Sequence, residues 1–166
     1  MSEEFTIPQD VFIFKLAKAL QMEHDMMEDL GTFQKAVQSR EVKDFFKNHQ
    51  KETKEQIKRL ERCFELLDKP ATPRPSPTAT GIRQEADTAI RKTSKELVDG
   101  VVLAASLSTE HHEMAMYETL ITLAEPLGEK EIVELLKETL KEEQETADEG
   151  KKLAATVVTE STQKMS

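Results

Sequence analysis

Cysteine is almost absent from this sequence, since Cys63 is the only one in 166 residues. A single cysteine excludes an intramolecular disulfide and a CxxC metal or redox centre, and it fits a reducing compartment. Basic residues are also in deficit, with 23 Lys and Arg against 32 Asp and Glu and a formal net charge of -9. No clustered basic segment is visible, so we expect neither nucleic acid nor an anionic membrane as a partner, whereas divalent cations would be attracted.

Long apolar runs are missing as well. The longest, VVLAASL at 101–107, is far too short to span a bilayer, and the opening MSEEFTIPQD lacks the basic start of a signal peptide. We therefore expect a soluble, cytoplasmic protein. Glycine and proline are scarce, with five and six residues, while 33% of the residues are charged and 37% are apolar. This mixture favours one helical globular domain over 1–166 rather than disorder or an all-β fold.

Four long segments carry apolar residues at helical spacing. Pro8 and Gly31 mark the ends of the first, and Ser39 is placed to cap the second. Pro126 and Gly128 separate the third from the fourth. The predicted helices span about 9–30, 40–68, 94–124 and 129–158.

The connection between the second and third predicted long helices has a different composition. Its segment KPATPRPSPTAT (69–80) has four prolines in twelve residues, so we expect an extended crossover. A short helix is expected over 81–92, and 159–166 is expected to be a frayed tail. Long helices joined by two short turns and one long crossover predict an all-α fold, a ferritin-like four-helix bundle over about 9–158.

Each predicted long helix places a glutamate on its inward face. Since an α-helix advances by about 100° per residue, the apolar face of the third helix passes through Glu110. Glu23 and Glu143 interrupt the apolar stripes of the first and fourth helices in the same way. Glu113 lies about 60° from Glu110, on the rim of its face, whereas His112 is expected to point toward solvent. The stripe of the second helix is interrupted by His49, Glu52 and Gln56.

Two loose sequence repeats indicate that these acids lie at a similar level along the bundle. MEHDMME (22–28) and TEHHEMA (109–115) both carry Glu-His followed by Met, and KETKEQ around Glu52 is echoed by KEEQET around Glu143. Four carboxylates in an apolar interior could not all stay ionised, because burial and mutual repulsion both raise their pKa values. No Lys or Arg lies on these stripes nearby. A divalent cation is the simplest charge partner, and an oxygen-rich set with one nitrogen suits iron or manganese better than zinc.

Three segments carry a family likeness: NHQKETKEQIKRLERCFELL (48–67), EHHEMAMYETLITLAEPLG (110–128) and LLKETLKEEQETAD (135–148). They are similar to segments of the YciE/YciF-type ferritin-like metal-binding proteins of bacteria and archaea, and the resemblance covers about residues 10–158. It implies a compact ferritin-like bundle, usually a dimer, with a dinuclear metal site between the helices and a stress-associated role.

The resemblance also implies metal ligands on all four long helices. Relatives place an aspartate four residues after the glutamate of the fourth helix, where this chain has Ala147 followed by Asp148. Asp148 lies about 140° from Glu143 and could join only through a local distortion such as a π-bulge. By its spacing, one turn from Glu52, His49 is a candidate for a further ligand or a hydrogen-bond partner of one, with a purely structural histidine as the alternative. Carried over by position, the ligands are Glu23, Glu52, Gln56, Glu110, Glu113 and Glu143.

Neither half of the chain contains the Glu-x-x-His pair of di-iron bundles, so a metal here would be more carboxylate-rich and less tightly held. Tyr117 is expected to pack in the core rather than to hydrogen-bond a ligand. A second apolar stripe on the first helix predicts a partner surface, most simply for a second copy in a homodimer. This stripe comprises Phe12, Ala19, Met22 and Met26.

These observations predict a ferritin-like protein that binds two divalent metal ions, iron or manganese. If the protein is catalytic, the bound ions would react with O2 or peroxide. The alternative is a non-catalytic helical dimer or a partner-binding scaffold whose acidic site is empty or vestigial. At the level of sequence, both the enzyme question and the identity of any catalytic residue stay open.

Overall fold

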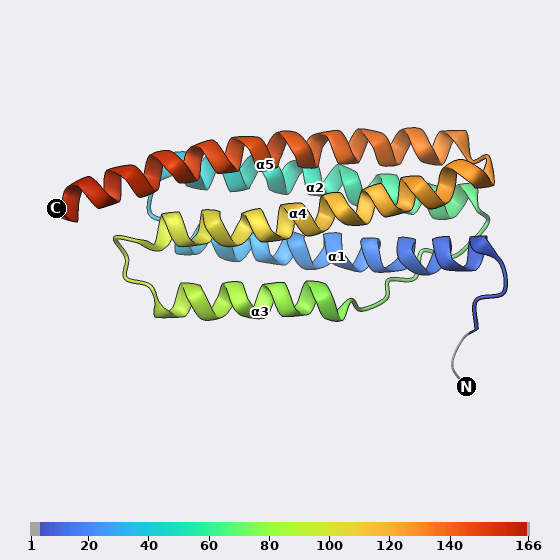
Figure 1. Ribbon diagram of the computed structural model, residues 1–166, viewed down its shortest axis with the longest axis horizontal. Helices are drawn as coiled ribbons and strands as arrows, with labels where there is room; N and C mark the ends of the chain where they lie inside the picture. The colour runs from blue at the N-terminus through green and yellow to red at the C-terminus, as the bar shows by residue number, and fades with distance from the viewer. Residues whose placement is uncertain (1–3, 166) are drawn as a thin grey trace.

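The computed structural model describes residues 4–165, and this part of the chain is helical without strands (Figure 1). It confirms the all-α prediction. None of the helices in these residues is both long enough and apolar enough to cross a membrane. The helices are α1 (Pro8–Ala36), α2 (Arg40–Leu66), α3 (Pro77–Lys92), α4 (Val98–Ala124) and α5 (Lys130–Met165), with a 3-10 turn η1 (Glu125–Leu127).

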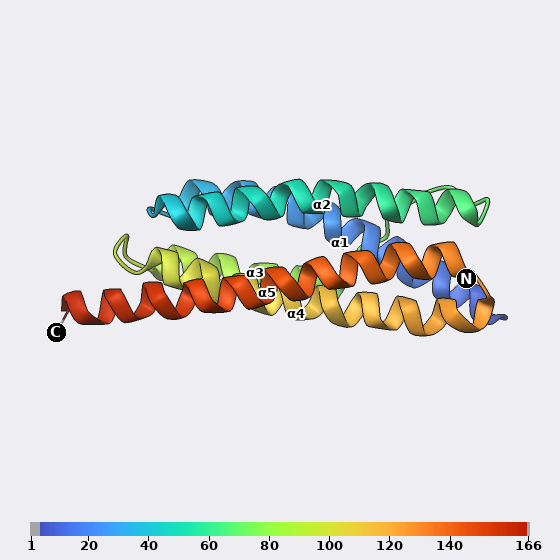
Figure 2. The same ribbon diagram turned by 90° about the horizontal axis from the view of Figure 1, so that it is seen from above.

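Four long helices lie lengthwise against one another; in Figure 2, α2 lies on one side, α4 and α5 lie on the other, and α1 runs obliquely from α2 toward them. The helix α1 packs on α2 and α4, and α5 packs on α4 and α2, so each long helix has two neighbours among the other three. The short helix α3 lies outside this group, against α4. We call α1, α2, α4 and α5 the four-helix core.

The apolar interior is divided into two clusters along the four-helix core. The first joins the N-terminal half of α1 to the C-terminal halves of α2 and α4, around Leu16, Phe64 and Leu120. The second joins the opposite halves, around Phe46 and Leu103. The buried polar residues of the four-helix core lie between the two clusters, toward the middle of its helices. This division sets the place of the site described below.

The first helix extends further than its sequence predicts. Gly31 was expected to end it, yet α1 continues to Ala36. Phe33 is buried there, with its ring 5.4 Å from that of Phe46. Burying a phenylalanine gains about 1.5–3 kcal/mol, which exceeds the cost of about 1 kcal/mol for a glycine inside a helix.

The C-terminal segment is helical rather than frayed. The helix α5 runs to Met165, so the prediction for 159–165 is wrong, while Ser166 lies outside the described residues. Hydroxyl groups along this segment donate to carbonyl oxygens one turn earlier, as Thr159 does to Ala155 at 2.7 Å. Such bonds give each hydroxyl group a hydrogen-bond acceptor within the helix itself.

The proline-rich connection is shorter than expected, because α3 begins at Pro77. Ser76 caps this helix by accepting from the backbone N–H of Ala79 at 3.5 Å, and proline is favoured in the first turn. Only Ala86 of α3 is fully buried. An ion pair from Arg83 to Asp29, at 2.7 Å, ties α3 to α1.

The stripe assigned to a partner surface is buried within the chain. Phe12, Ala19 and Met22 belong to the first apolar cluster and Met26 to the second, and none is more than 2% exposed. The reason is that α1 turns two apolar faces toward its own neighbours, α2 and α4. The homodimer therefore stays a prediction without support from this stripe.

Substituting two helical glycines by alanine tests how tightly their surroundings are packed. A Cβ at Gly81 would meet nothing within 4 Å, whereas at Gly150 it would lie 3.0 Å from Cζ of Phe45. Gly81→Ala should therefore raise the free energy of unfolding by about 0.5–1 kcal/mol through helix propensity. Gly150→Ala should gain less or lose, because Phe45 must shift. Denaturant titration of both variants checks this, and equal gains would contradict tight packing at Gly150.

Candidate metal centre

A group of polar side chains is buried where the two apolar clusters meet. The four helices of the core all contribute, and each contributed side chain is at most 2% exposed. No lysine or arginine is among the buried polar residues of the described chain. The acidic, amide and imidazole members of the group are Glu23, His49, Gln56, Glu110, Glu113 and Glu143.

Four of these residues bring one potential ligand atom each to a common point. The atoms of His49, Glu110, Glu113 and Glu143 all lie within 4.8 Å of one another. The imidazole lies between two acids, with Nδ1 3.3 Å from Oε1 of Glu110 and Nε2 3.7 Å from Oε2 of Glu143. We call this set the His-Glu cluster. It could hold a metal ion.

The polar atoms of the His-Glu cluster have no hydrogen-bond partner in the protein. This holds for both oxygens of Glu110, Glu113 and Glu143 and for both ring nitrogens of His49, which approach the acids without hydrogen-bond geometry. A buried polar atom without a partner costs about 1–3 kcal/mol, and a charged one costs more. Three carboxylates and one imidazole match the donors that iron and manganese accept, so the residues fit such an ion.

Burial dominates the electrostatics of the cluster. It raises the pKa values of Glu110 and Glu113 well above the ordinary range, and the charge of Glu143 raises them further. The pKa of Glu23 rises to about 8 for the same two reasons. Burial would lower the pKa of His49, but the surrounding carboxylates, Glu143 foremost, more than offset it and raise this pKa. A cation at this point would favour the ionised carboxylates.

Glu23 lies beside the His-Glu cluster and is anchored by one oxygen. Its Oε1 accepts a hydrogen bond from the hydroxyl of Tyr117, and its Oε2 has no partner. The expectation that Tyr117 only packs is therefore wrong. Both residues are fully buried, so the hydroxyl must find an acceptor, and the carboxylate of α1 is the one in reach.

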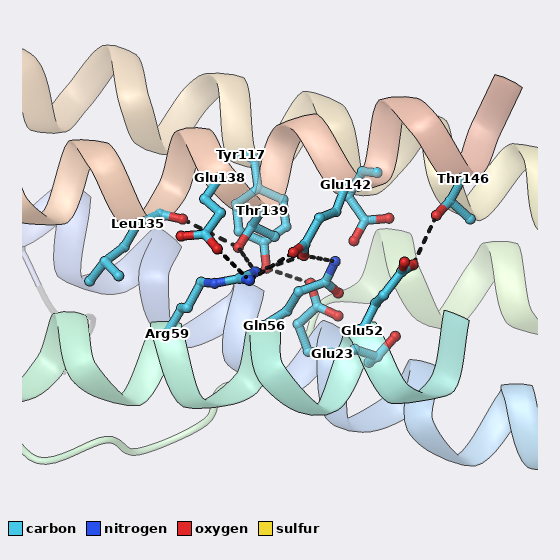
Figure 3. A network of polar contacts seen from close by, with 12 residues as sticks. Glu23, Glu52, Gln56, Arg59, Tyr117, Leu135, Glu138, Thr139, Glu142 and Thr146 are labelled. Carbon is cyan, nitrogen blue, oxygen red and sulfur yellow. Dashed lines mark hydrogen bonds and ion pairs between the residues drawn. The ribbon is translucent and has the colours of Figure 1, made fainter. Parts of the chain in front are cut away.

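The two remaining predicted ligands come from α2 and differ in burial. Gln56 is fully buried; its Nε2 donates to Oε2 of Glu142 at 3.2 Å and its Oε1 has no partner (Figure 3). Glu52 is only half-buried, at the edge of the core, and its Oε2 accepts from the hydroxyl of Thr146 at 3.2 Å. Burial raises the pKa of Glu52.

Two positions, Glu113 and His112, differ from their predicted facing, and Asp148 lies where a regular helix puts it. Glu113 was placed on the rim but is fully buried, because α4 turns Ser106 and Glu113 inward, and neither polar residue marks an apolar stripe. His112 was expected in solvent but is partly buried, and it lines a small cavity together with Met22 of α1 and Arg83 of α3. Asp148 is exposed, because α5 is α-helical without a π-bulge, so it lies outside the His-Glu cluster.

The sequence interpretation missed Arg59 and Glu142. The guanidinium of Arg59 donates to both carboxylate oxygens of Glu142, each at 2.7 Å, to Glu138 at 2.9 Å and to the hydroxyl of Thr139 at 3.2 Å (Figure 3). The available signal was the spacing of Glu138 and Glu142, one turn apart on α5. It could be interpreted only once α5 was known to pack on α2.

Comparison with known proteins shows close relatives. The chain is 36% identical over 140 residues to the protein YciF of Escherichia coli strain K12, covering 83% of this chain and 84% of YciF. The crystal structure of that stress protein matches with a TM-score of 0.88, covering 93% of this chain and 99% of YciF, at 32% identity in the superposition. YcfI from Rhodopseudomonas palustris matches with a TM-score of 0.87 at 28% identity, covering 91% of this chain and 97% of YcfI.

The family assignment covers almost the whole chain. Residues 7–163 match the family model described as Domain of unknown function (DUF892). The matched segment includes every helix of the four-helix core except two terminal residues of α5. This chain therefore belongs to the DUF892 family and is a relative of the stress protein YciF.

Proposed function

We propose that the protein binds two divalent metal ions, iron or manganese, between the helices of a ferritin-like bundle. The observation that carries the proposal is the convergence of buried donor atoms without partners in the protein. His49, Glu110, Glu113 and Glu143 would hold one ion. Glu23, Gln56 and Glu52, which lie beside them, would complete a position for the second.

Two features support the dinuclear proposal. Glu23 accepts a hydrogen bond from Tyr117 through Oε1, and Gln56 donates one to Glu142 through Nε2. Each side chain is left with one buried oxygen that has no partner. In Figure 3 the carboxylate of Glu23 and the amide of Gln56 point toward one another, whereas the carboxylate of Glu52, one turn away on α2, points toward Thr146. Four long helices with one long crossover and a carboxylate from each helix also correspond to the arrangement of ferritin-like carboxylate proteins.

Bound iron would supply redox chemistry toward O2 or peroxide. The chain's own contribution would be to exclude water through the two apolar clusters, to hold Glu23 in place through Tyr117, and to supply the carboxylates that balance the charge of the ions. The description of the Escherichia coli relative as a stress protein supports a stress-related role. We place that role in the cytoplasm, and a homodimer remains part of the proposal.

The alternative is a non-catalytic structural role. YcfI, the relative from Rhodopseudomonas palustris, has been described as a candidate structural protein. In that case the buried acids would be held protonated and would bind no ion. The two proposals differ in one measurable quantity, the metal content of the folded protein.

Glu113→Gln and Glu143→Gln should each lower the affinity for Mn2+ or Fe2+ at least about tenfold, because each removes a buried anionic donor. Glu118→Gln, an exposed change on the same helix as Glu113, should bind as the wild type does. Equilibrium dialysis followed by elemental analysis measures the bound metal. Wild-type protein that binds none under anaerobic loading, or variants that all bind equally, would count against the metal centre.

After removal of metal by a chelator, stability should fall as the pH rises from about 6 to about 8. The folded-state pKa values of Glu23, Glu110 and Glu113 are raised, so the native state holds protons that the unfolded state releases, and the free energy of unfolding decreases over this window. The raised pKa of His49 acts in the same direction. We expect a loss of about 2 kcal/mol or more.

The control is the same titration on two variants. Glu113→Gln should show a shallower loss of stability than the wild type, and Glu118→Gln an unchanged one. Added Mn2+ should reverse the slope, because metal binding requires deprotonated ligands. Urea denaturation at each pH measures the effect. A metal-free protein whose stability is constant or rises over this range would refute the electrostatic argument.

A further inference from the structure

The amide of Gln56 is held in one orientation by a residue outside the proposed metal centre. Its Nε2 donates to Oε2 of Glu142 at 3.2 Å, while its Oε1 is buried and has no partner. The side chain of Gln56 is inaccessible to solvent. Water therefore cannot satisfy the free oxygen as it would at a surface.

Glu142 acts only as an acceptor because of Arg59. Both of its oxygens accept hydrogen bonds from the guanidinium, each at 2.7 Å, in the two-pronged geometry of a strong arginine–carboxylate pair. Arg59 is fixed in turn by Glu138 and by the hydroxyl of Thr139. Because both oxygens of Glu142 act as acceptors toward Arg59, the group of Gln56 that faces Glu142 is the NH2 group, which donates to it.

We infer that Glu142, held by Arg59, is a positioning residue that turns the amide oxygen of Gln56 toward the second metal ion. The inference rests on the proposed dinuclear function. An amide turned the other way would present N–H groups, which repel a cation. The orientation thus decides whether Gln56 is a ligand or an obstacle.

The same contact explains why an amide suits this position. A carboxylate at residue 56 would face the carboxylate of Glu142 across 3.2 Å, and like charges at that distance repel. The amide NH2 group donates to the neighbouring carboxylate on one side, and the amide offers a neutral oxygen on the other. A neutral oxygen also adds no further negative charge to a centre that already contains Glu23, Glu110, Glu113 and Glu143.

The test replaces the acceptor at position 142 by a donor. In Glu142→Lys the ammonium group would donate to the oxygen of Gln56 and turn its NH2 group toward the centre. We expect the affinity for the second Mn2+ to fall about 10–100-fold while the first is retained. Glu138→Lys is the matched control, since it reverses the same charge beside Arg59 without touching Gln56. Adding Gln56→Glu to Glu142→Lys should restore the second ion, because a carboxylate can accept from the lysine and still offer an oxygen.

Equilibrium dialysis with Mn2+ gives the number of ions per chain, and electron paramagnetic resonance distinguishes a coupled pair of ions from a single one. Thermal melts establish that each variant is folded. Unchanged binding in Glu142→Lys, an equal loss in Glu138→Lys, or no recovery in the double variant would overturn the inference and leave the metal centre standing. Wild-type protein that binds fewer than two ions would instead overturn the dinuclear function.

Discussion

The burial of acidic side chains without a compensating cation from the protein is the constraint on which the rest of the structure depends. Moving a carboxylate into a low-dielectric interior is strongly unfavourable unless it is paired, protonated or bound to a metal. The two apolar clusters on either side offset this cost by burying large side chains such as Phe46, Phe64 and Leu120. Long helices follow from the same requirement, because an apolar cluster on each side of a central polar segment needs several turns of helix.

The fold and the positions of the acids could be predicted to different degrees. Helical periodicity gave the long helices and the burial of Glu23, Glu110 and Glu143, because each interrupts an apolar stripe of its helix. It failed on α4, where Ala104 and Val101 face α3 and not the core. One helix with two packed faces has no single stripe, and this is why Glu113 was assigned to the rim.

Contacts between helices account for the other differences. Periodicity put His49 on the inward stripe of α2, but it gave no sign that the ring lies between Glu110 of α4 and Glu143 of α5, which are remote from it in sequence. The hydrogen bond from Tyr117 to Glu23 joins α4 to α1 in the same way. Spacing along one helix carries no information on which neighbour a side chain meets, so these partners required the packing itself. Helix ends were missed for the same reason, since Phe33 extends α1 through its contact with Phe46.

Two consecutive glutamates of α5 show how the chain distributes its charges. Glu142 lies at the edge of the core and accepts both prongs of Arg59, whereas Glu143 is fully buried and has no hydrogen-bond partner. Arg59 therefore pairs with the partly exposed Glu142, although the next residue along the helix, the buried Glu143, has no partner. Without a cation, this arrangement destabilises the fold in a way that a small shift of Arg59 or an exchange of Glu143 for an apolar residue would relieve. The arrangement is understandable if the charge on Glu143 is balanced by a metal ion, which needs that carboxylate ionised and without a competing partner.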